Sequence, residues 1–322
     1  MANRSDKTEI KIGVSMCLLG ENVRYDGGHK HDRYITDILG QFFKFVPVCP
    51  EVEVGMGVPR EPVHLEGTAS NTRMVGNKTA EDWTARMVAF REKRLKQLAK
   101  YKLSGYILKK DSPSCGMERV KLYNEKSQAE RKGRGLWGGA LQDIYPLLPA
   151  EEEGRLNDAA LRENFIVRVF AYHSLQQVLG NGAFKRKDII AFHTSQKLLL
   201  MAHSPKHYSE LGKLVAAIAD YKPSEFATQY SELFMAGLKM KTTIKKNINV
   251  LHHIMGYMKK TLDKEDKADV LRTIEDYRAG LVPLIVPLTL VRHYIMKFNI
   301  EYIMGQTYLN PHPKELMLRN HV

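Results

Sequence analysis

Short apolar segments alternate with longer amphipathic ones in the first half of the chain. The apolar, β-branched pattern of buried strands occurs at residues 10–17, 42–48 and 104–110. Helical periodicity lies between them, at residues 32–43 and 81–100. Strands that alternate with helices favour a parallel βαβ sheet. We therefore predict an α/β, Rossmann-like domain over residues 1–148.

The second half has helical periodicity almost throughout. The predicted helices span residues 161–179, 186–202, 208–219, 224–238, 243–258, 264–279 and 287–302, with a turn at Gly182 after the first. The boundary is expected in the segment 148–154, where a proline precedes three glutamates. Residues 149–322 are thus predicted to form an all-α domain.

The charge balance favours a polyanionic partner. Lysine and arginine number 49 against 36 acidic residues, which makes the net charge +13 and the pI about 9.4. The excess is spread over both halves. Residues 1–7 lack the apolar core of a signal peptide, and prolines interrupt the apolar stretch 281–291. We expect a cytoplasmic protein without a membrane span and infer no obligate protein partner.

The three cysteines stand where the predicted strands end. Cys17, Cys49 and Cys115 each follow one strand, and the carboxyl ends of parallel strands meet at the edge where ligands bind. An odd number of cysteines argues against a disulfide framework, and no C-x-x-C pair indicates a zinc ribbon. Inert packing remains one interpretation. Three thiolates around an iron–sulfur cluster, with one iron left open, is the other.

Motifs around these cysteines resemble those of the thiouracil desulfidase family. They are residues 15–20 with 23–27, residues 47–51 with 55–60, and residues 112–116. The resemblance covers about the first 145 residues, and all three motifs are intact.

The second half resembles a helical domain, long of unknown function, that is fused to this desulfidase in some bacteria. The segments that carry the resemblance are residues 192–203, 249–257, 283–288 and 292–294. Together the two halves are similar to bacterial desulfidases that convert 4-thiouridine in tRNA to uridine and release sulfide.

The resemblance implies a 4Fe-4S cluster held by Cys17, Cys49 and Cys115, with an open iron that acts as a Lewis acid in a non-redox hydrolysis. For proton transfer we choose Glu51 as the base, and we assign Ser112 to positioning the ring or the water. Two alternatives stay open: Glu51 caps a helix, and Ser112 is a turn residue that orients Cys115.

Further candidates surround these residues. The predicted substrate-binding side chains are Ser15, Arg24, Tyr25, Asp26, Arg60 and Ser114. Alternatively, an arginine–aspartate pair supports a loop, and the two serines donate hydrogen bonds to cluster sulfurs. The predicted tRNA-binding side chains are Arg131, Lys132, Arg134, Lys185, Arg186, Lys187, Lys241, Lys245 and Lys246. The first three belong to residues 121–134, which we expect to be a mobile loop.

Three rival functions remain. The enzyme could act on free thiouracil or thionucleotides, or the protein could bind tRNA and carry a cluster that is structural or senses oxidation. In a third interpretation Cys115 is a nucleophile near His64. The histidines of the second half have no metal-ligand spacing, so we predict no metal there.

Overall fold

The computed structural model describes residues 9–180 and 184–321, so residues 1–7 and the predicted turn at Gly182 lie outside the described part. The chain divides into two compact units, up to Asn157 and from Asp158 onward. This division lies beyond the expected boundary at 148/149, because a short strand at residues 150–152 pairs with the first unit. Each unit is described separately below.

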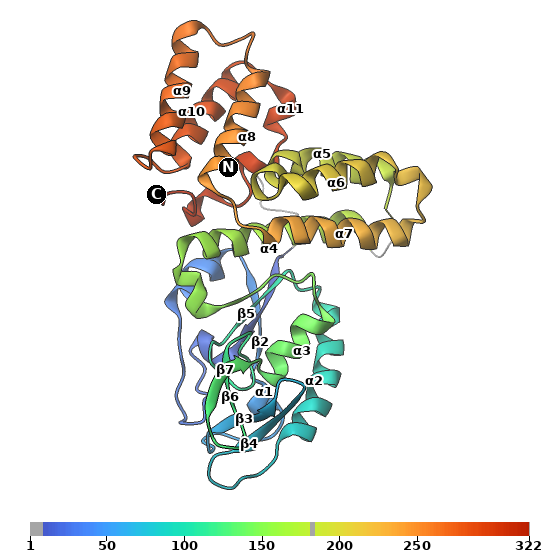
Figure 1. Cartoon of the computed structure of the whole chain (residues 1–322), viewed down its shortest axis with the longest axis vertical. Helices are drawn as coiled ribbons and strands as arrows, with labels where there is room; N and C mark the ends of the chain where they lie inside the picture. The colour runs from blue at the N-terminus through green and yellow to red at the C-terminus, as the bar shows by residue number, and fades with distance from the viewer. Residues whose placement is uncertain (1–8, 181–183, 322) are drawn as a thin grey trace. The chain divides into compact units, whose positions relative to one another are not determined.

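The first unit contains the predicted parallel sheet (Figure 1). Its strands are β1 (Lys11–Ser15), β2 (Lys44–Val48), β5 (Gly105–Leu108) and β8 (Ala150–Glu152), in the order β2-β1-β5-β8. All three pairings are parallel. Cys17 and Cys49 therefore follow neighbouring strands at the same edge of the sheet.

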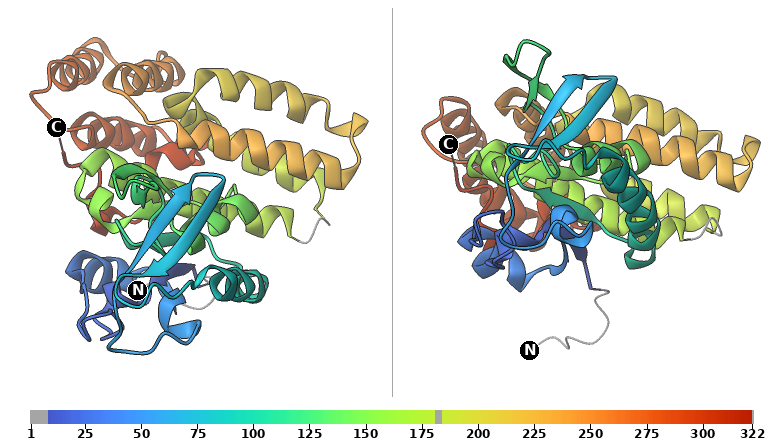
Figure 2. Two further views of the ribbon diagram at one scale, coloured as in Figure 1. Left: turned by 60° about the horizontal axis from the view of Figure 1, so that its bottom comes forward. Right: turned by 90° about the horizontal axis from the view of Figure 1, so that it is seen from below.

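A second sheet, which the sequence pattern did not predict, has the order β4-β3-β6-β7. Its strands are β3 (Val63–Thr68), β4 (Asn71–Gly76), β6 (Val120–Tyr123) and β7 (Ala129–Gly133). Figure 2 shows β3 and β4 as a long ribbon in cyan. The expectation of a loop over residues 121–134 is wrong, because Val120 and Leu122 are buried and place β6 beside β3.

Three helices complete the first unit. They are α1 (Pro50–Glu53), α2 (Thr84–Leu98) and α3 (Leu136–Ile144), and α2 and α3 lie side by side (Figure 1). Trp137 of α3 is fully buried, and its indole N–H donates to the Tyr106 hydroxyl of β5 at 3.2 Å. The predicted helix at residues 32–43 is instead a π-turn at Tyr34–Ile38 followed by a 3-10 turn at Leu39–Gln41.

The second unit is helical, as predicted. Its helices are α4 (Ala159–Leu179), α5 (Arg186–His203), α6 (Pro205–Ala216), α7 (Pro223–Lys239), α8 (Ile244–Tyr257), α9 (Lys264–Arg278), α10 (Ile285–Lys297) and α11 (Glu301–Met304). Side chains of Asp158, Ser204, Thr243 and Asp263 cap four of them. In the described part of the chain, no helix is both long and apolar enough to cross a membrane.

Candidate functional site

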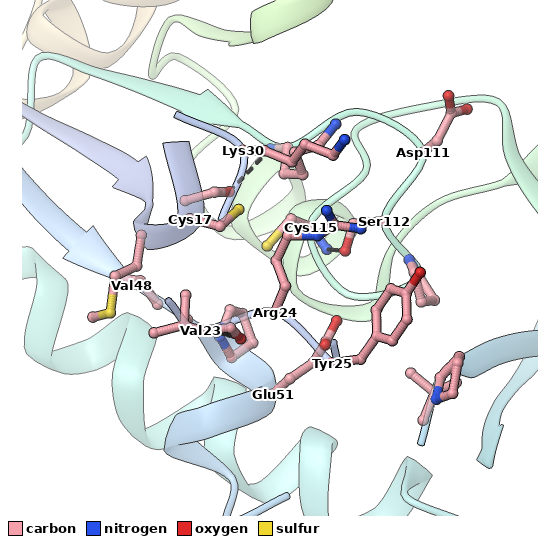
Figure 3. Close-up of a pocket in the computed structure, with 18 of the residues that line it drawn as sticks. Cys17, Val23, Arg24, Tyr25, Lys30, Val48, Glu51, Asp111, Ser112 and Cys115 are labelled. Carbon is pink, nitrogen blue, oxygen red and sulfur yellow. Dashed lines mark hydrogen bonds between the residues drawn. The ribbon is translucent and has the colours of Figure 1, made fainter. Parts of the chain in front are cut away.

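The three cysteines line one pocket of about 330 Å³ in the first unit (Figure 3). Cys17 lies in the 3-10 turn Met16–Leu19 directly after β1, and Cys49 precedes α1 after β2. Cys115 lies in the turn that follows β5. All three are free thiols, and the last two are buried. The sequence-based expectation that they converge at one sheet edge is therefore consistent with the structure.

Burial raises the pKa of all three thiols. Loss of hydration is the main cause, and it raises the pKa of Cys17 to about 11. The pKa values of Cys49 and Cys115 are also raised, and the other thiols contribute to the shift of Cys115. A thiol with a raised pKa is a poor nucleophile unless a metal or a base removes its proton.

The alternative in which Cys115 is a nucleophile near His64 is not supported. His64 lies outside the pocket lining, in β3, where its Nδ1 is 2.7 Å from the Asn77 side-chain oxygen. The described pocket lining contains no histidine. The histidine that this alternative requires therefore does not border Cys115 in the described lining.

The donor set fits an iron–sulfur cluster. Three thiols from three different loops face one cavity, and the described lining offers neither a fourth cysteine nor a histidine. Within residues 9–180 and 184–321, no three His, Cys, Asp or Glu side chains form a cluster suited to a single metal ion. Three cysteine thiols are a ligand set that leaves one iron of such a cluster open.

Glu51 lies beside this cavity and is held at both carboxylate oxygens. Its Oε1 accepts a hydrogen bond of 2.6 Å from the Ser114 hydroxyl. Its Oε2 accepts from Nε of Arg60 at 3.1 Å and from Nη2 of the same guanidinium. The alternative role as a helix cap is wrong, because the backbone N–H of Cys49 donates to Glu53 instead.

Arg60 connects Glu51 to two loops beside the pocket. Its side chain is only 6% exposed, and its Nη1 donates to the carbonyl oxygens of Val23 at 3.0 Å and Gly57 at 2.9 Å. Its backbone N–H donates to Tyr25. We predicted Arg60 to bind substrate; it lines the pocket, but its donors are already engaged with Glu51 and two loops.

The two serines near Cys115 have different roles. The Ser112 hydroxyl lines the pocket and accepts from the backbone N–H groups of Ser114 and Cys115, at 3.2 and 3.0 Å. Those bonds support the turn interpretation, and its proton stays available to a ligand. Ser114 is fully buried and does not line the pocket, so its predicted contact with substrate is wrong. Its hydroxyl donates a hydrogen bond to Glu51 instead.

Ser15 forms a hydrogen bond with the Cys115 thiol. This agrees with the alternative in which Ser15 donates to a sulfur rather than binding substrate. Its Oγ accepts from the backbone N–H of Lys109 at 2.9 Å, and its hydroxyl hydrogen bond lowers the pKa of Cys115 against the larger effect of burial. Ser15 therefore stabilises the thiolate form of Cys115.

Arg24, Tyr25 and Asp26 form the loop on one side of the pocket. Arg24 and Tyr25 line it, with the guanidinium 5.2 Å from the ring centroid. Asp26 does not line the pocket, so the prediction that it binds substrate is wrong. Its carboxylate accepts from the Gly28 N–H, which holds its pKa below the usual range, and lies 3.6 Å from Arg24. Asp26 therefore shapes the loop.

Lys30, Lys109 and Lys110 also line the pocket, and the sequence analysis missed all three. Lys109 and Lys110 directly follow β5, so their position at a strand end was a usable signal. Lys30 carries no such signal, because only the fold brings its backbone N–H to the Cys17 carbonyl at 2.9 Å.

Several predicted tRNA-binding cations have acidic or carbonyl partners. Arg131 lies 3.0 Å from Asp111, Lys132 pairs with Glu130, and Arg134 lies 3.0 Å from Asp143. These exposed pairs are weak and leave the side chains accessible.

The predicted cations of the second unit differ in accessibility. Lys246 donates to the carbonyl oxygens of His203 and Lys241, at 2.6 and 3.0 Å, so its assignment to RNA contact is wrong. The side chains of Lys185, Arg186, Lys187, Lys241 and Lys245 are exposed.

Known proteins resemble both units. The family described as 2-thiouracil desulfurase matches residues 12–153, and a family described as a protein of unknown function (DUF1722) matches residues 197–313. The uncharacterized protein YbbK of Bacillus subtilis (strain 168) is 33% identical over 153 residues, 46% of this chain and 98% of its own. The uncharacterized protein YbgA of Escherichia coli (strain K12) is 28% identical over 159 residues, 49% of this chain and 94% of its own.

One solved structure is also similar to part of the chain. It is described as the [4Fe-4S]-dependent thiouracil desulfidase TudS, and it is 30% identical. The match covers 48% of this chain and 98% of that one, with a TM-score of 0.39.

Proposed function

Since this chain belongs through its first unit to the 2-thiouracil desulfurase family, we propose that it removes sulfur from 4-thiouridine in tRNA. Membership of the family makes it a desulfidase that cleaves a C–S bond. The tRNA substrate is our inference from the helical unit and the basic surface. The reaction consumes water and converts the thiocarbonyl to a carbonyl, with sulfide released and no net redox change.

The predicted 4Fe-4S cofactor agrees with the solved relative, which is described as dependent on that cluster. In this chain Cys17, Cys49 and Cys115 would hold it. When bound through three thiolates, such a cluster supplies an open iron that acts as a Lewis acid toward sulfur. One observation carries the proposal: all three thiols line the cavity that Glu51 and Ser112 also line.

Residues of the chain itself would transfer the proton and orient the substrate and the water. Oε1 of Glu51 keeps one lone pair besides the one used by Ser114, so the carboxylate can accept a proton from water. The Ser112 hydroxyl has its proton free to hold the ring or the water. Arg60 and Ser114 hold the carboxylate in one orientation, so they are positioning residues.

Three features of the chain and one requirement of the reaction support RNA as the larger substrate. The net charge is +13, the exposed cations Lys185, Arg186 and Lys187 lie together around the start of α5, and Lys241 and Lys245 are exposed near α8. A stacked nucleotide must also be turned out to reach a pocket, which requires a wider grip on the RNA than a free base does. We propose that the second unit provides this grip and that the enzyme acts in the cytoplasm without a protein partner.

An anaerobic incubation of the cluster-loaded protein with thiolated bulk tRNA tests the proposal. Digestion and mass spectrometry would follow 4-thiouridine, 2-thiouridine and uridine, with free thiouracil assayed in parallel. Selective conversion of 4-thiouridine to uridine is expected. Turnover of free thiouracil alone would replace the tRNA proposal by the free-base reaction. Survival of every thio compound at full iron content would favour a structural or sensing cluster.

A further inference from the structure

The second unit contains a long run of cations without acids. Residues 233–262 include no aspartate or glutamate, and their lysines are Lys239, Lys241, Lys245, Lys246, Lys259 and Lys260. Helix α8 lies in the middle of this run, and its exposed polar side chains are Lys245, Asn249, His252 and His253. Each of these groups can donate a hydrogen bond and none is negative, so this face of α8 suits a polyanion.

Free ammonium groups lie at both ends of α8. Lys245 is in its first turn, and Lys259 and Lys260 come shortly after its last residue, Tyr257. All three lysines are exposed, and in the part of the second unit that the structure describes no ion pair engages them. The helix between residues 245 and 257 is about 18 Å long, which is enough for several nucleotides.

Two exposed tyrosines stack on each other at the C-terminal end of α8. The rings of Tyr257 in α8 and Tyr302 in α11 have centroids 5.2 Å apart and an angle of 24° between their planes. The two residues are 44% and 39% exposed. The His253 ring lies 5.7 Å from the Tyr257 ring, at 74° to it. Figure 1 shows α8 and α11 side by side, so the pair joins two helices of the same unit.

Both rings keep more surface in water than a packing contact needs. Tyr230 and Tyr308 pack inside the same unit, and both are fully buried. A stacked pair that stays exposed offers a ring face on which another flat ring can continue the stack. Burial and the neighbouring Tyr257 hydroxyl raise the pKa of Tyr302, so its phenol stays neutral at physiological pH and does not repel an anion.

Aromatic rings beside free cations are a combination that binds single-stranded nucleic acids. Unpaired bases stack on aromatic side chains, and the backbone phosphates pair with nearby lysines. A duplex offers its phosphates to the lysines but keeps its bases stacked within itself. A segment with unpaired bases therefore uses both features of this surface.

We propose that Tyr257 and Tyr302, together with the lysines Lys245, Lys259 and Lys260, form a surface that binds unpaired nucleotides of RNA. Bases stack on the tyrosine pair, and the lysines contact the phosphates on either side. The inference rests on the proposed function, because it takes RNA as the partner of the second unit. It adds that this unit selects a single-stranded segment, such as a loop or an end, over a duplex.

Fluorescence anisotropy with labelled oligoadenylate tests this surface in the cluster-loaded full chain. The probes are a single strand of about ten nucleotides and the same strand paired with oligouridylate. Neither probe contains a thiolated base, so turnover plays no part. A surface that acts by charge alone should prefer the duplex, which has the higher charge density. We expect the single strand to bind about tenfold more tightly than the duplex instead, because its bases can stack on the tyrosines.

Substitutions of the two tyrosines separate stacking on RNA from packing within the protein. Tyr257→Leu and Tyr302→Leu keep an apolar contact but lose the ring, so each should weaken single-strand binding about tenfold and leave duplex binding unchanged. Tyr257→Phe and Tyr302→Phe keep the ring and should bind as tightly as the original chain. Tyr101→Leu is the matched control, because Tyr101 is 40% exposed and lies in the first unit. Circular dichroism and urea unfolding verify that each variant is folded.

Tyr257→Trp gives a second measurement at the same position. Trp83 and Trp137 lie in the first unit and contribute a constant background. The single strand should quench the fluorescence of the added indole by stacking on it, whereas the duplex should not. Equal or tighter binding of the duplex, leucine variants that behave like the control, phenylalanine variants that lose binding, or an unquenched indole would each overturn the proposed surface.

The two proposals fail separately. A protein that prefers single-stranded oligoadenylate through Tyr257 and Tyr302 but leaves 4-thiouridine in tRNA intact would keep the stacking surface and remove the tRNA substrate. A protein that desulfurates tRNA equally well with and without the two tyrosine rings, and that prefers the duplex probe, would keep the proposed function and remove the stacking surface.

Discussion

The guanidinium of Arg60 holds the carboxylate of Glu51 through two N–H groups at the wall of the cysteine pocket. Both side chains are largely buried, with 6% and 15% of their surface exposed. The same guanidinium ties down the Val23 and Gly57 carbonyls. One arginine thus fixes the orientation of the proposed base and the loops on either side of it.

Replacement of Glu51 by glutamine should abolish turnover and leave the cysteine ligands intact. The amide keeps a hydrogen-bond acceptor but accepts no proton, so the rate should fall about 100-fold or more. Rate assays with thiolated tRNA, together with cluster absorbance and iron content, measure the two effects. Glu92→Gln, at an exposed position of α2, is the control. An active Glu51→Gln variant would refute the assignment.

Replacement of Arg60 by glutamine should reduce turnover about 10- to 100-fold, because the base loses its partner. A lysine at this position keeps the charge but offers no planar fork, so Arg60→Lys should recover only part of the rate. Single-turnover rates and iron content distinguish misorientation from cluster loss. Arg86→Gln removes an exposed arginine of the same unit and should have no effect. Unchanged rates in Arg60→Gln would exclude the positioning role.

Ser15→Ala should change the reduction potential of the cluster without unfolding the protein. The variant loses the hydroxyl hydrogen bond to the Cys115 sulfur and leaves the Lys109 N–H without its acceptor. Loss of a hydrogen bond to a cluster sulfur lowers the reduction potential. Voltammetry of the loaded protein should show this shift, which exposed Ser127→Ala should lack. Identical potentials in both variants would contradict the role of Ser15.

Substitutions of two adjacent lysines of α8 should have different effects: one should lower stability and the other should weaken RNA binding. Lys246→Gln removes charged hydrogen bonds to two carbonyls and should cost about 1–2 kcal/mol of the free energy of unfolding. Exposed Lys245→Gln should leave stability within about 0.5 kcal/mol and reduce the salt dependence of tRNA binding. Urea unfolding and binding titrations over salt measure both. The opposite pattern would show that Lys246 contacts RNA.

Acid should destabilise the second unit through its buried histidines. Burial lowers the pKa of the His193 and His203 imidazoles to about 4, against 6.5 when they are hydrated. At each of them the unfolded chain therefore takes up a proton that the folded chain refuses, and stability is lost as the pH falls from 6.5 toward 4. A shift of this size corresponds to about 3 kcal/mol.

Urea unfolding of the full chain between pH 7.5 and 4.5 measures this loss. His203→Gln should remove only part of the pH dependence, because His193 keeps its lowered pKa, whereas the exposed His252→Gln should leave it unchanged. If the free energy of unfolding falls equally with pH in both variants, other groups cause the acid sensitivity.

Three of the four parallel strands, the helical second unit and the place of each cysteine after a strand were predictable from the chain's pattern alone. These features follow from local rules, because apolar periodicity sets strands and helices, capping side chains start the helices, and parallel strands end at one edge. The desulfidase motifs around Cys17, Cys49 and Cys115 were likewise visible in the sequence.

The partners of the other side chains could not be predicted without the fold. Arg60 and Ser114 approach Glu51 from separate loops, and Lys246 bonds to the end of another helix. The second sheet likewise depends on the fold, which pairs β3 with β6 across more than fifty residues of sequence. Each depends on which segments the fold brings together and which charges then find partners, and no periodicity along the chain encodes that pairing.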